Sequence, residues 1–499
     1  MSDAALPTSL DAWLARLEAA HPVGIDLGLE RVAEVARRMG LLEAPIAGRV
    51  ITVAGTNGKG STVAMLEALA RAHGVSTAAY TSPHLLRYNE RLRLDGKEAG
   101  DALLIAGFEA VEAARLDGEP VSLTYFEVGT LGALWAIARR PPDLAILEVG
   151  LGGRLDAVNV IDPDVAVVTT VARDHAAFLG DDLQGIGREK AGILRAGRPA
   201  VLGSTTLPAS VKAVASELGA RVYALDEAFW RQGDGEGWGF SGRVAEVAPL
   251  GSDPLDEKGP QQRLSMRASE PMGSDPKGYP PSERNCPPPV SDPTGEVAHQ
   301  ARPDSRGVLA LGGLPDPGLP LDNAATALQA LALAGVPLEL GACRRALCRV
   351  ALPGRMQWLG RWCLDVGHNP HAATYLAERL LVRPCDGRTI ALLGMLGDKD
   401  ADGVMAALAP AVDAWVPVGL AGERARTADD LAERLVARGE EVWHRAASPA
   451  EGAAWLAARL APEDRVLVCG SFFTVGEVLA WWQSSAQTEA DETTIEGAP

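Results

Sequence analysis

The stretch Arg49–Leu66, RVITVAGTNGKGSTVAML, decides the fold of this chain. It begins as an apolar run typical of a buried strand, passes through a glycine-rich turn and continues as a helix that ends near Gly74. Glycines let backbone N–H groups approach phosphate oxygens, and the helix N-terminus adds the positive end of its dipole. Lys59 supplies a charge for the outer phosphates, followed by the hydroxyls of Ser61 and Thr62. The stretch therefore predicts a nucleotide-phosphate site.

The loop departs from the general GxxxxGK[ST] pattern of phosphate-binding loops. Val53 stands where that pattern has its first glycine, and Gly60 separates Lys59 from Ser61. An ordinary glycine-rich turn between a strand and a helix is the alternative interpretation. A lysine and two hydroxyls converge within the expected strand–loop–helix context, which favours phosphate binding.

Further apolar strands alternate with helix-length segments along the chain, which predicts parallel sheets covered on both faces. The expected strands are 143–150, 164–171, 362–367, 389–396, 414–419 and 465–471. The fold class is therefore α/β, with a parallel-sheet domain over residues 1–335 and a smaller α/β domain over 336–483. Residues 244–304 are rich in Pro, Gly and Ser, and we expect a disordered insertion there. Residues 484–499 are expected to form a flexible acidic tail.

The bulk composition excludes several classes of protein. A formal net charge of -18 argues against nucleic-acid binding and against docking on anionic membranes. The N-terminus lacks the basic start and apolar core of a secretory signal, and no apolar run of about 18 residues predicts a membrane span. We therefore expect a soluble cytoplasmic protein whose partners are small molecules.

Several motifs carry a family resemblance. GTNGKGS (55–61) resembles the variant phosphate loop of the Mur ligase superfamily. Further segments resemble its folylpolyglutamate synthase branch, and within it the bacterial bifunctional dihydrofolate synthase/folylpolyglutamate synthases. These segments are IDLGLERV (25–32), TSPHLLRYNER (81–91), SLTYFE (122–127), LEVGLGGRLDA (147–157), DH (174–175), IGREKAGI (186–193), LPGR (352–355), DVGHNPHA (365–372), GMLGDKD (394–400) and CGSF (469–472). The resemblance runs from about residue 10 to about residue 483, apart from the insertion.

The resemblance implies a Mur-type central domain with a phosphate loop and a smaller Rossmann-like C-terminal domain that closes over the nucleotide. It also implies a reaction: ATP phosphorylates a carboxylate, and the amine of L-glutamate attacks the acyl phosphate. The acceptor is dihydropteroate in one mode and a reduced folate in the other. The implied cofactors are ATP and Mg²⁺, with a monovalent cation as a further candidate, and the implied state is a monomer.

The family's functional residues carry over to matching positions. The ATP positions are Thr56, Asn57, Gly58, Lys59, Gly60, Ser61, Asn323, Arg355 and Asp365. The magnesium positions are Ser82, Glu148 and His175, and the catalytic set is Lys59, Glu148, His175 and Lys190. The pterin positions are Ile25, Asp26, Leu27, Thr124, Tyr125, Phe126, Glu127, Leu155, Asp156 and Ala157. His368 is a further candidate for contact with the phosphoryl region, although capping of the following helix accounts for it equally well.

Lys190 has an unusual implied role, because the matching lysine of the family is carbamylated and so becomes a carboxylate-like group able to bind metal. The plain alternative is a helix lysine paired with a nearby carboxylate. One motif departs from the family. An LDHTD-like stretch is frequent there, whereas Arg173–Ala177 reads RDHAA, keeping His175 but losing a hydroxyl and a carboxylate.

Three other functions compete with the bifunctional ligase. The first is a folylpolyglutamate synthase without the dihydrofolate synthase activity. The second is a sister Mur-type ligase for a cell-wall precursor, which the segments 124–127 and 154–157 disfavour. The third is a non-catalytic nucleotide-binding module, against which the following residues argue by their joint presence: Lys59, Glu148, His175, Lys190, Arg355 and Asp365.

Overall fold

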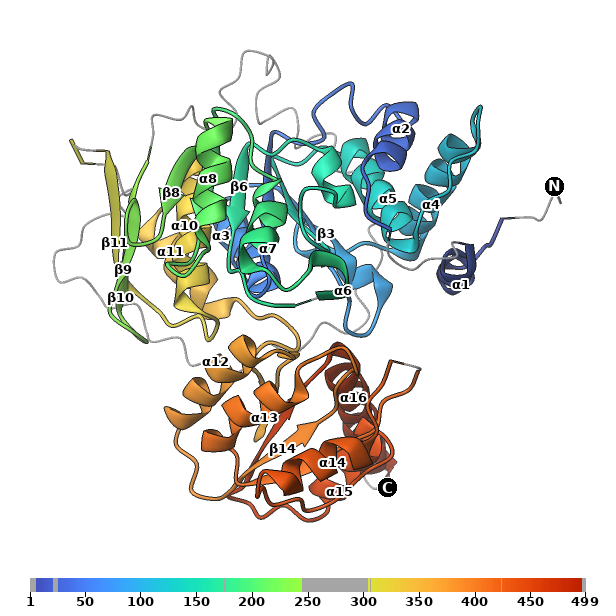
Figure 1. The fold of residues 1–499 in the computed structure, drawn as a ribbon, viewed down its shortest axis with the longest axis vertical. Coiled ribbons are helices and arrows are strands. Elements are labelled where there is room, and N and C mark those ends of the chain that lie inside the picture. The colour runs from blue at the N-terminus through green and yellow to red at the C-terminus, as the bar shows by residue number, and fades with distance from the viewer. Residues whose placement is uncertain are drawn as a thin grey trace. The chain divides into compact units, whose positions relative to one another are not determined.

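The computed structural model describes residues 6–20, 26–174, 176–244, 304–305, 307–422 and 424–495, with side chains except at 176–177 and 486–495. The chain divides into two compact units (Figure 1). Unit 1 comprises residues up to His84 and from Tyr88 to Val350, and unit 2 comprises Leu85–Arg87 and the chain from Ala351. The insertion expected at 244–304 lies, except at its two ends, outside the described residues.

Unit 1 is built on an eight-stranded sheet. Its strands, in spatial order, are β4 (Lys97–Glu98), β3 (Leu92–Leu94), β2 (Thr77–Tyr80), β5 (Leu144–Glu148), β1 (Arg49–Ala54), β6 (Val165–Val168), β7 (Pro199–Leu202) and β8 (Arg221–Ala224). The strands from β2 to β8 run parallel, and β3 and β4 add antiparallel pairs at one edge. The strands β2, β5, β6 and β7 are fully buried, and so is β1 apart from Arg49. Their near-continuous apolar runs are expected for a sheet covered on both faces.

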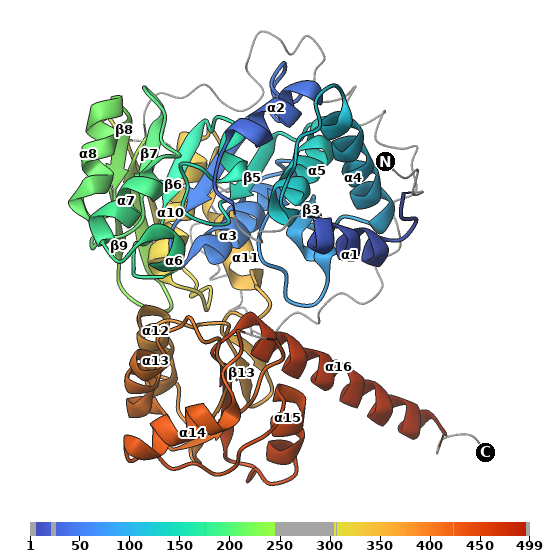
Figure 2. The ribbon, with the colours of Figure 1, turned by 45° about the vertical axis from the view of Figure 1, so that its right-hand side comes forward.

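Helices cover both faces of this sheet (Figures 1 and 2). They are α1 (Leu10–Ala20), α2 (Glu30–Arg38), α3 (Lys59–Ala72), α4 (Asp101–Leu116), α5 (Tyr125–Arg139), α6 (Ala176–Leu179), α7 (Leu183–Ala191), α8 (Ala209–Leu218), α10 (Leu321–Leu333) and α11 (Leu340–Arg349), with 3₁₀ turns η1 (Tyr88–Arg91) and η2 (Ala157–Val160). On one face α3 and α10 contact the strands, and α11 packs on α3. On the other face α4, α5, α7 and α8 bury alternate strand residues.

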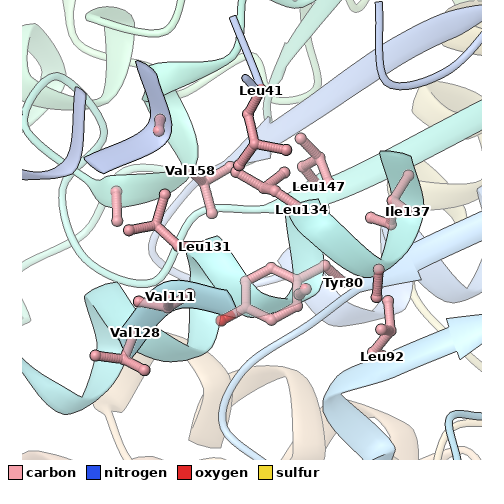
Figure 3. Close-up of a cluster of buried hydrophobic side chains, with 14 of the residues drawn as sticks. Leu41, Tyr80, Leu92, Val111, Val128, Leu131, Leu134, Ile137, Leu147 and Val158 are labelled. Atoms are coloured by element: carbon pink, nitrogen blue, oxygen red, sulfur yellow. The ribbon is translucent and has the colours of Figure 1, made fainter. Parts of the chain in front are cut away.

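The core under α4 and α5 is closely packed around Tyr80 of β2 (Figure 3). Leu131 and Leu134 of α5 and Val111 of α4 lie around the Tyr80 ring, and all three are fully buried. The Tyr80 hydroxyl is hydrogen-bonded to the Thr130 hydroxyl at 3.1 Å, so its polar atom is satisfied inside the core. This packing holds α5 against the sheet.

A small antiparallel sheet adjoins α10. It consists of β9 (Phe229–Gln232), β10 (Trp238–Arg243) and β11 (Val308–Leu314), in the order β11-β10-β9. The chain leaves β10 at the same end at which it enters β11, because Arg243 pairs with Val308 and the Val244 N–H donates to the Gly307 carbonyl at 2.9 Å. The two ends of the insertion are therefore adjacent.

Unit 2 is a five-stranded sheet flanked by helices. Its strands, in spatial order, are β12 (Gln357–Leu359), β13 (Trp362–Leu364), β16 (Arg465–Cys469), β14 (Thr389–Leu393) and β15 (Ala414–Pro417), parallel except for β12. The helices are α12 (Pro370–Leu381), α13 (Ala401–Leu408), α14 (Ala428–Ala437), α15 (Pro449–Ala457) and α16 (Phe472–Ile495), with the 3₁₀ turn η3 (Ala409–Ala411). None of the helices in the described ranges has the length and hydropathy needed to cross a bilayer.

Two boundaries differ from the sequence-based expectation. Unit 1 continues to Val350 rather than 335, because α11 packs on α3. The segment 484–495, expected to be a loose tail, continues α16 as a helix. Its Ala, Gln and Glu residues are good helix formers, which explains why the helix does not stop at the last apolar turn.

Candidate active site

Four neighbouring parallel strands of unit 1 deliver the predicted site residues to one edge of the sheet. The strands β2, β5, β1 and β6 end in the same direction. Ser82 follows β2, Glu148 ends β5, the phosphate loop follows β1, and Asp174 follows β6. After β1 the chain passes to β2 on the far side of β5, whereas after β5 it crosses β1 to reach β6 on the other side. Ligands of open α/β sheets bind at such a switch point, beyond the carboxyl ends of the strands.

The phosphate loop needs its glycines for steric reasons. A Cβ at Gly55 would collide with the Thr169 hydroxyl. Gly58 has φ +85°, and a Cβ there would lie 2.8 Å from Nδ2 of Asn323. Only a residue without a side chain fits either position.

Lys59 and Ser61 stand at the start of α3. The Lys59 ammonium donates to the Gly55 carbonyl at 3.1 Å and to the Thr56 carbonyl at 3.4 Å, so it folds across the loop. The Ser61 hydroxyl donates to the Gly58 carbonyl and accepts a 2.8 Å hydrogen bond from Asn323 Nδ2. The structure thus brings Asn323, 262 residues away in sequence, into contact with the loop.

The loop is also braced by the segment after β6, which sequence reasoning missed. The Thr56 N–H donates to the Thr170 carbonyl at 2.8 Å, and the Thr56 hydroxyl exchanges hydrogen bonds with the Ala172 backbone at 3.0 and 3.1 Å. The paired hydroxyls of Thr169 and Thr170 at a strand end are the signal that could have identified this brace. The same segment leads to Asp174 and His175, and His175 lies outside the described residues.

Lys190 is buried in α7, with 4% of its surface exposed. Burial, together with the positive charge of Lys59, lowers its pKa to about 7 against the opposing effect of Asp174 and Asp156. Burial raises the pKa of Asp156 to about 6, although hydrogen bonds from the Leu151 and Val158 N–H groups and the charge of Lys59 oppose the rise. Lys190 therefore interacts electrostatically with Lys59, Asp156 and Asp174.

The predicted magnesium residues are partly within the described chain. Glu148 is 4% exposed at the end of β5, and Ser82 is half-buried after β2. Carboxylate and hydroxyl oxygens are ligands that Mg²⁺ prefers, so these two residues fit the ion chemically. Over the described ranges, no three His, Cys, Asp or Glu side chains gather as a metal cluster.

The predicted pterin residues gather around the N-termini of α2 and α5. Arg31 pairs with Asp26 at 2.7 Å and with Glu127 at 2.8 Å, so it links both sides of this region. Thr124 and Glu127 form a capping box at the start of α5. Leu27 follows Asp26 in the sequence and is half-buried, whereas Ile25 lies outside the described residues.

The aromatic pair that begins α5 is half-buried. Phe126 lies against Gly150, where any Cβ would meet its ring, and 6.5 Å from the Tyr80 ring. Tyr125 contacts the edge of Tyr88 at 6.0 Å. Leu155 is half-buried and Ala157 is buried in the nearby turn. These contacts show a packing role for both rings and leave part of each exposed.

In unit 2, Arg355, Asp365 and His368 lie together near the ends of β13 and β16. The Asp365 carboxylate accepts hydrogen bonds from the Met356 and Gly367 N–H groups, and Arg355 lies 3.8 Å from it. Burial raises the Asp365 pKa, while the positive charge of Arg355 opposes the rise. His368 Nδ1 is 2.9 Å from the Val366 carbonyl. Asn369, not His368, caps α12.

Two family descriptions match the chain. The Mur ligase middle domain matches residues 53–202, and the glutamate ligase domain of Mur ligases matches residues 354–472. The dihydrofolate synthase/folylpolyglutamate synthase of Escherichia coli K12 is 41% identical over 474 residues, which is 94% of each chain. Its namesake from Haemophilus influenzae is 34% identical and covers 94% of this chain and 97% of its own.

Solved structures agree with these relatives. The Escherichia coli protein FolC in complex with DHPP and ADP has a TM-score of 0.79 at 38% identity, covering 96% of this chain and 99% of its own. A bifunctional folylpolyglutamate synthase/dihydrofolate synthase with Mn, AMPPNP and L-glutamate bound has a TM-score of 0.75 at 40% identity, covering 95% of this chain and 98% of its own.

Proposed function

Since the chain belongs to the dihydrofolate synthase/folylpolyglutamate synthase family of Mur ligases, we propose that it uses ATP to join L-glutamate to dihydropteroate and to reduced folates. The similarity to the Escherichia coli enzyme over 94% of both chains carries this conclusion. It covers both the sheet that bears the phosphate loop and the second, glutamate-ligase unit. The chain is thus an ATP-dependent acid–amino-acid ligase with an α/β fold.

The residues of unit 1 suit the first step, transfer of the γ-phosphoryl group of ATP to the acceptor carboxylate. This step depends on positioning and charge neutralisation rather than on covalent help from the protein. The N-terminus of α3 and Lys59 present positive charge to the phosphates. The Lys59 ammonium donates to the Gly55 and Thr56 carbonyls, so its charge lies over the loop that is proposed to hold the phosphates.

We assign the divalent-metal position to Ser82, Glu148 and His175. A magnesium ion bound there would neutralise charge on the phosphates during transfer. The buried carboxylate of Glu148 at the strand end supports the assignment, because carboxylate oxygens are ligands that Mg²⁺ prefers.

For Lys190 we propose carbamylation. A neutral amine is the form that attacks CO₂, and a pKa of about 7 leaves a large neutral fraction near neutral pH. The new N–C bond forms as one proton leaves, and the product carries a negative charge. That charge suits a site that already contains Lys59.

We propose that the pterin binds beside the charged residues Asp26, Glu127 and Arg31. Its ring would contact Phe126 and Tyr125. In unit 2, Arg355, Asp365 and His368 are proposed to contact ATP, with Asp365 on ribose hydroxyls. We place the protein in the cytoplasm, where ATP and glutamate are available, and propose that it acts as a monomer.

The test is ATP-dependent phosphate release with L-glutamate and Mg²⁺, run separately with dihydropteroate and with tetrahydrofolate, with products identified by mass spectrometry. We expect addition of one glutamate to each acceptor. Addition to tetrahydrofolate alone would reduce the function to folylpolyglutamate synthesis. Bound ATP without addition to either acceptor would overturn the proposal in favour of the sister ligase or the non-catalytic module.

A further inference from the structure

The Asn57 residue of the phosphate loop is held on one side by two threonine hydroxyls. The Asn57 N–H donates to Thr170 Oγ1 at 3.0 Å, and the same hydroxyl donates back to the Asn57 carbonyl at 3.0 Å. Thr169 Oγ1 donates to this carbonyl at 2.7 Å. Two donors satisfy both lone pairs of one carbonyl oxygen, so its direction is fixed.

This arrangement determines where the next N–H group points. The Asn57 carbonyl and the Gly58 N–H belong to one planar trans peptide, in which they point in opposite directions. Because the threonines hold the carbonyl on the β6 side, the Gly58 N–H faces away from β6. Gly58 immediately precedes α3, and backbone N–H groups at a helix start are the donors that bind phosphate.

We propose that Thr170, together with Thr169, is a positioning residue for ATP that sets the Asn57–Gly58 peptide in its phosphate-binding orientation before the nucleotide arrives. The inference rests on the proposed function, because it assumes that the loop binds ATP phosphates. Thr170 acts through the loop rather than by touching the reacting atoms. Without its hydroxyl only the Thr169 bond holds the Asn57 carbonyl, so the peptide has more freedom to rotate and part of the binding energy is used to order it.

The chain offers a matched control. Thr52 lies in β1, is fully buried, and its hydroxyl has no hydrogen-bond partner among the residues that the structure describes. Thr52→Val and Thr170→Val make the same isosteric change, but only the second removes hydrogen bonds to the loop. Thr170→Ser keeps the hydroxyl and serves as the conservative variant.

The experiment measures ADP binding with Mg²⁺ by calorimetry, KM for ATP, dihydropteroate and glutamate, and the unfolding midpoint without nucleotide. For Thr170→Val we expect the ADP Kd and the ATP KM to rise roughly tenfold, the scale of one or two lost hydrogen bonds. We expect KM for the other two substrates to stay within about twofold. Thr52→Val and Thr170→Ser should match the wild type.

An unchanged ADP affinity in Thr170→Val would overturn the inference, as would a Thr170→Ser variant as weak as Thr170→Val. If Thr170→Val does not fold, Thr170→Ala takes its place with the same expectation. The two proposals fail in different ways. A wild type that binds ADP but adds no glutamate defeats the proposed function, whereas the ADP affinities still decide the role of Thr170.

Discussion

At the scale of single residues, two lysines with different surroundings share one region of unit 1. Lys59 is half-buried in the phosphate loop, while Lys190 is buried and has a pKa of about 7 instead of 10.5. An unfolded chain therefore binds more protons than the folded one between about pH 7 and 10.5. The free energy of unfolding contributed by unmodified Lys190 rises with pH across that window. Its neutral fraction, and so its reactivity towards CO₂, also rises as the pH passes 7.

Replacing Lys190 tests the carbamate. We expect Lys190→Ala to lower turnover roughly 100-fold or more, because a negative charge placed at the site is lost. Millimolar acetate should restore part of the activity by filling the space with a carboxylate. Lys212→Ala, whose side chain is half exposed and paired with Glu227, is the control. A carbamate carbon signal in the ¹³C spectrum of wild type under ¹³CO₂ should grow as the pH rises from 6 to 8; its absence would contradict carbamylation.

Lys59→Ala tests the phosphate loop itself. We expect turnover to fall roughly 1,000-fold, since a charge that stabilises the transferring phosphoryl group is removed. The unfolding midpoint should change little, because Lys59 donates to carbonyls of a surface loop that the Thr169–Ala172 segment also holds. Turnover and circular dichroism measure the two effects separately, and a fully active variant would refute the assignment.

At the scale of elements, the residues proposed to bind substrates lie at the ends of helices and strands. The capping box of Thr124 and Glu127 fixes the start of α5, and Arg31 of α2 reaches the same glutamate. The N-terminus of α5 is therefore both a folding signal and one wall of the proposed pterin site. A change in the cap should affect stability and acceptor binding together.

Thr124→Ala separates these two roles when compared with Thr427→Ala. Each threonine caps a helix by accepting a backbone N–H, α5 in one case and α14 in the other. We expect both substitutions to lower the free energy of unfolding by about 1 kcal/mol in urea titrations. Only Thr124→Ala should also raise KM for dihydropteroate. Equal KM values in the two variants would remove Thr124 from the acceptor site.

The sequence was sufficient to predict the strand–loop–helix unit, the α/β fold and the family, and the comparisons confirm the fold and the family. It did not reveal the brace from Thr169 and Thr170 or the bridge from Arg31. Hydrogen bonds between loops distant in sequence leave no periodic pattern. The adjacent hydroxyls of Thr169 and Thr170 at a strand end were a local signal of the brace, but the sequence did not show which loop they contact. The roles predicted for individual residues, including Ser82, Glu148 and His175, stay predictions.

At the scale of the whole molecule, the small antiparallel sheet makes the long insertion separable from the fold. β10 and β11 are paired through Arg243 and Val308, and a hydrogen bond joins Val244 to Gly307. These pairings hold the two ends of the insertion next to each other. The entropy of closing a loop depends weakly on its length, about 0.6 kcal/mol for each doubling.

Deleting residues 249–303 and joining the ends with a short Gly-Ser linker tests this independence. We expect ligase activity within about threefold of wild type and an equal or slightly higher unfolding midpoint, because the shorter loop loses less entropy on folding. Steady-state kinetics with both acceptors and calorimetric unfolding are the measurements. A deletion variant that fails to fold would show that the insertion is structural.

The paired ends at Val244 and Gly307 also define a position where a second protein domain can be inserted into this enzyme. A reporter domain with closely spaced termini would fit between these two residues, because β10 and β11 are already paired at that point. The inserted domain would not distort the phosphate loop, because that loop is held by the pairing of β1 with β6 and by the Thr169 hydroxyl. In evolutionary terms, such a hairpin lets lineages gain and lose sequence freely, so length polymorphism at this position is the pattern we expect among relatives.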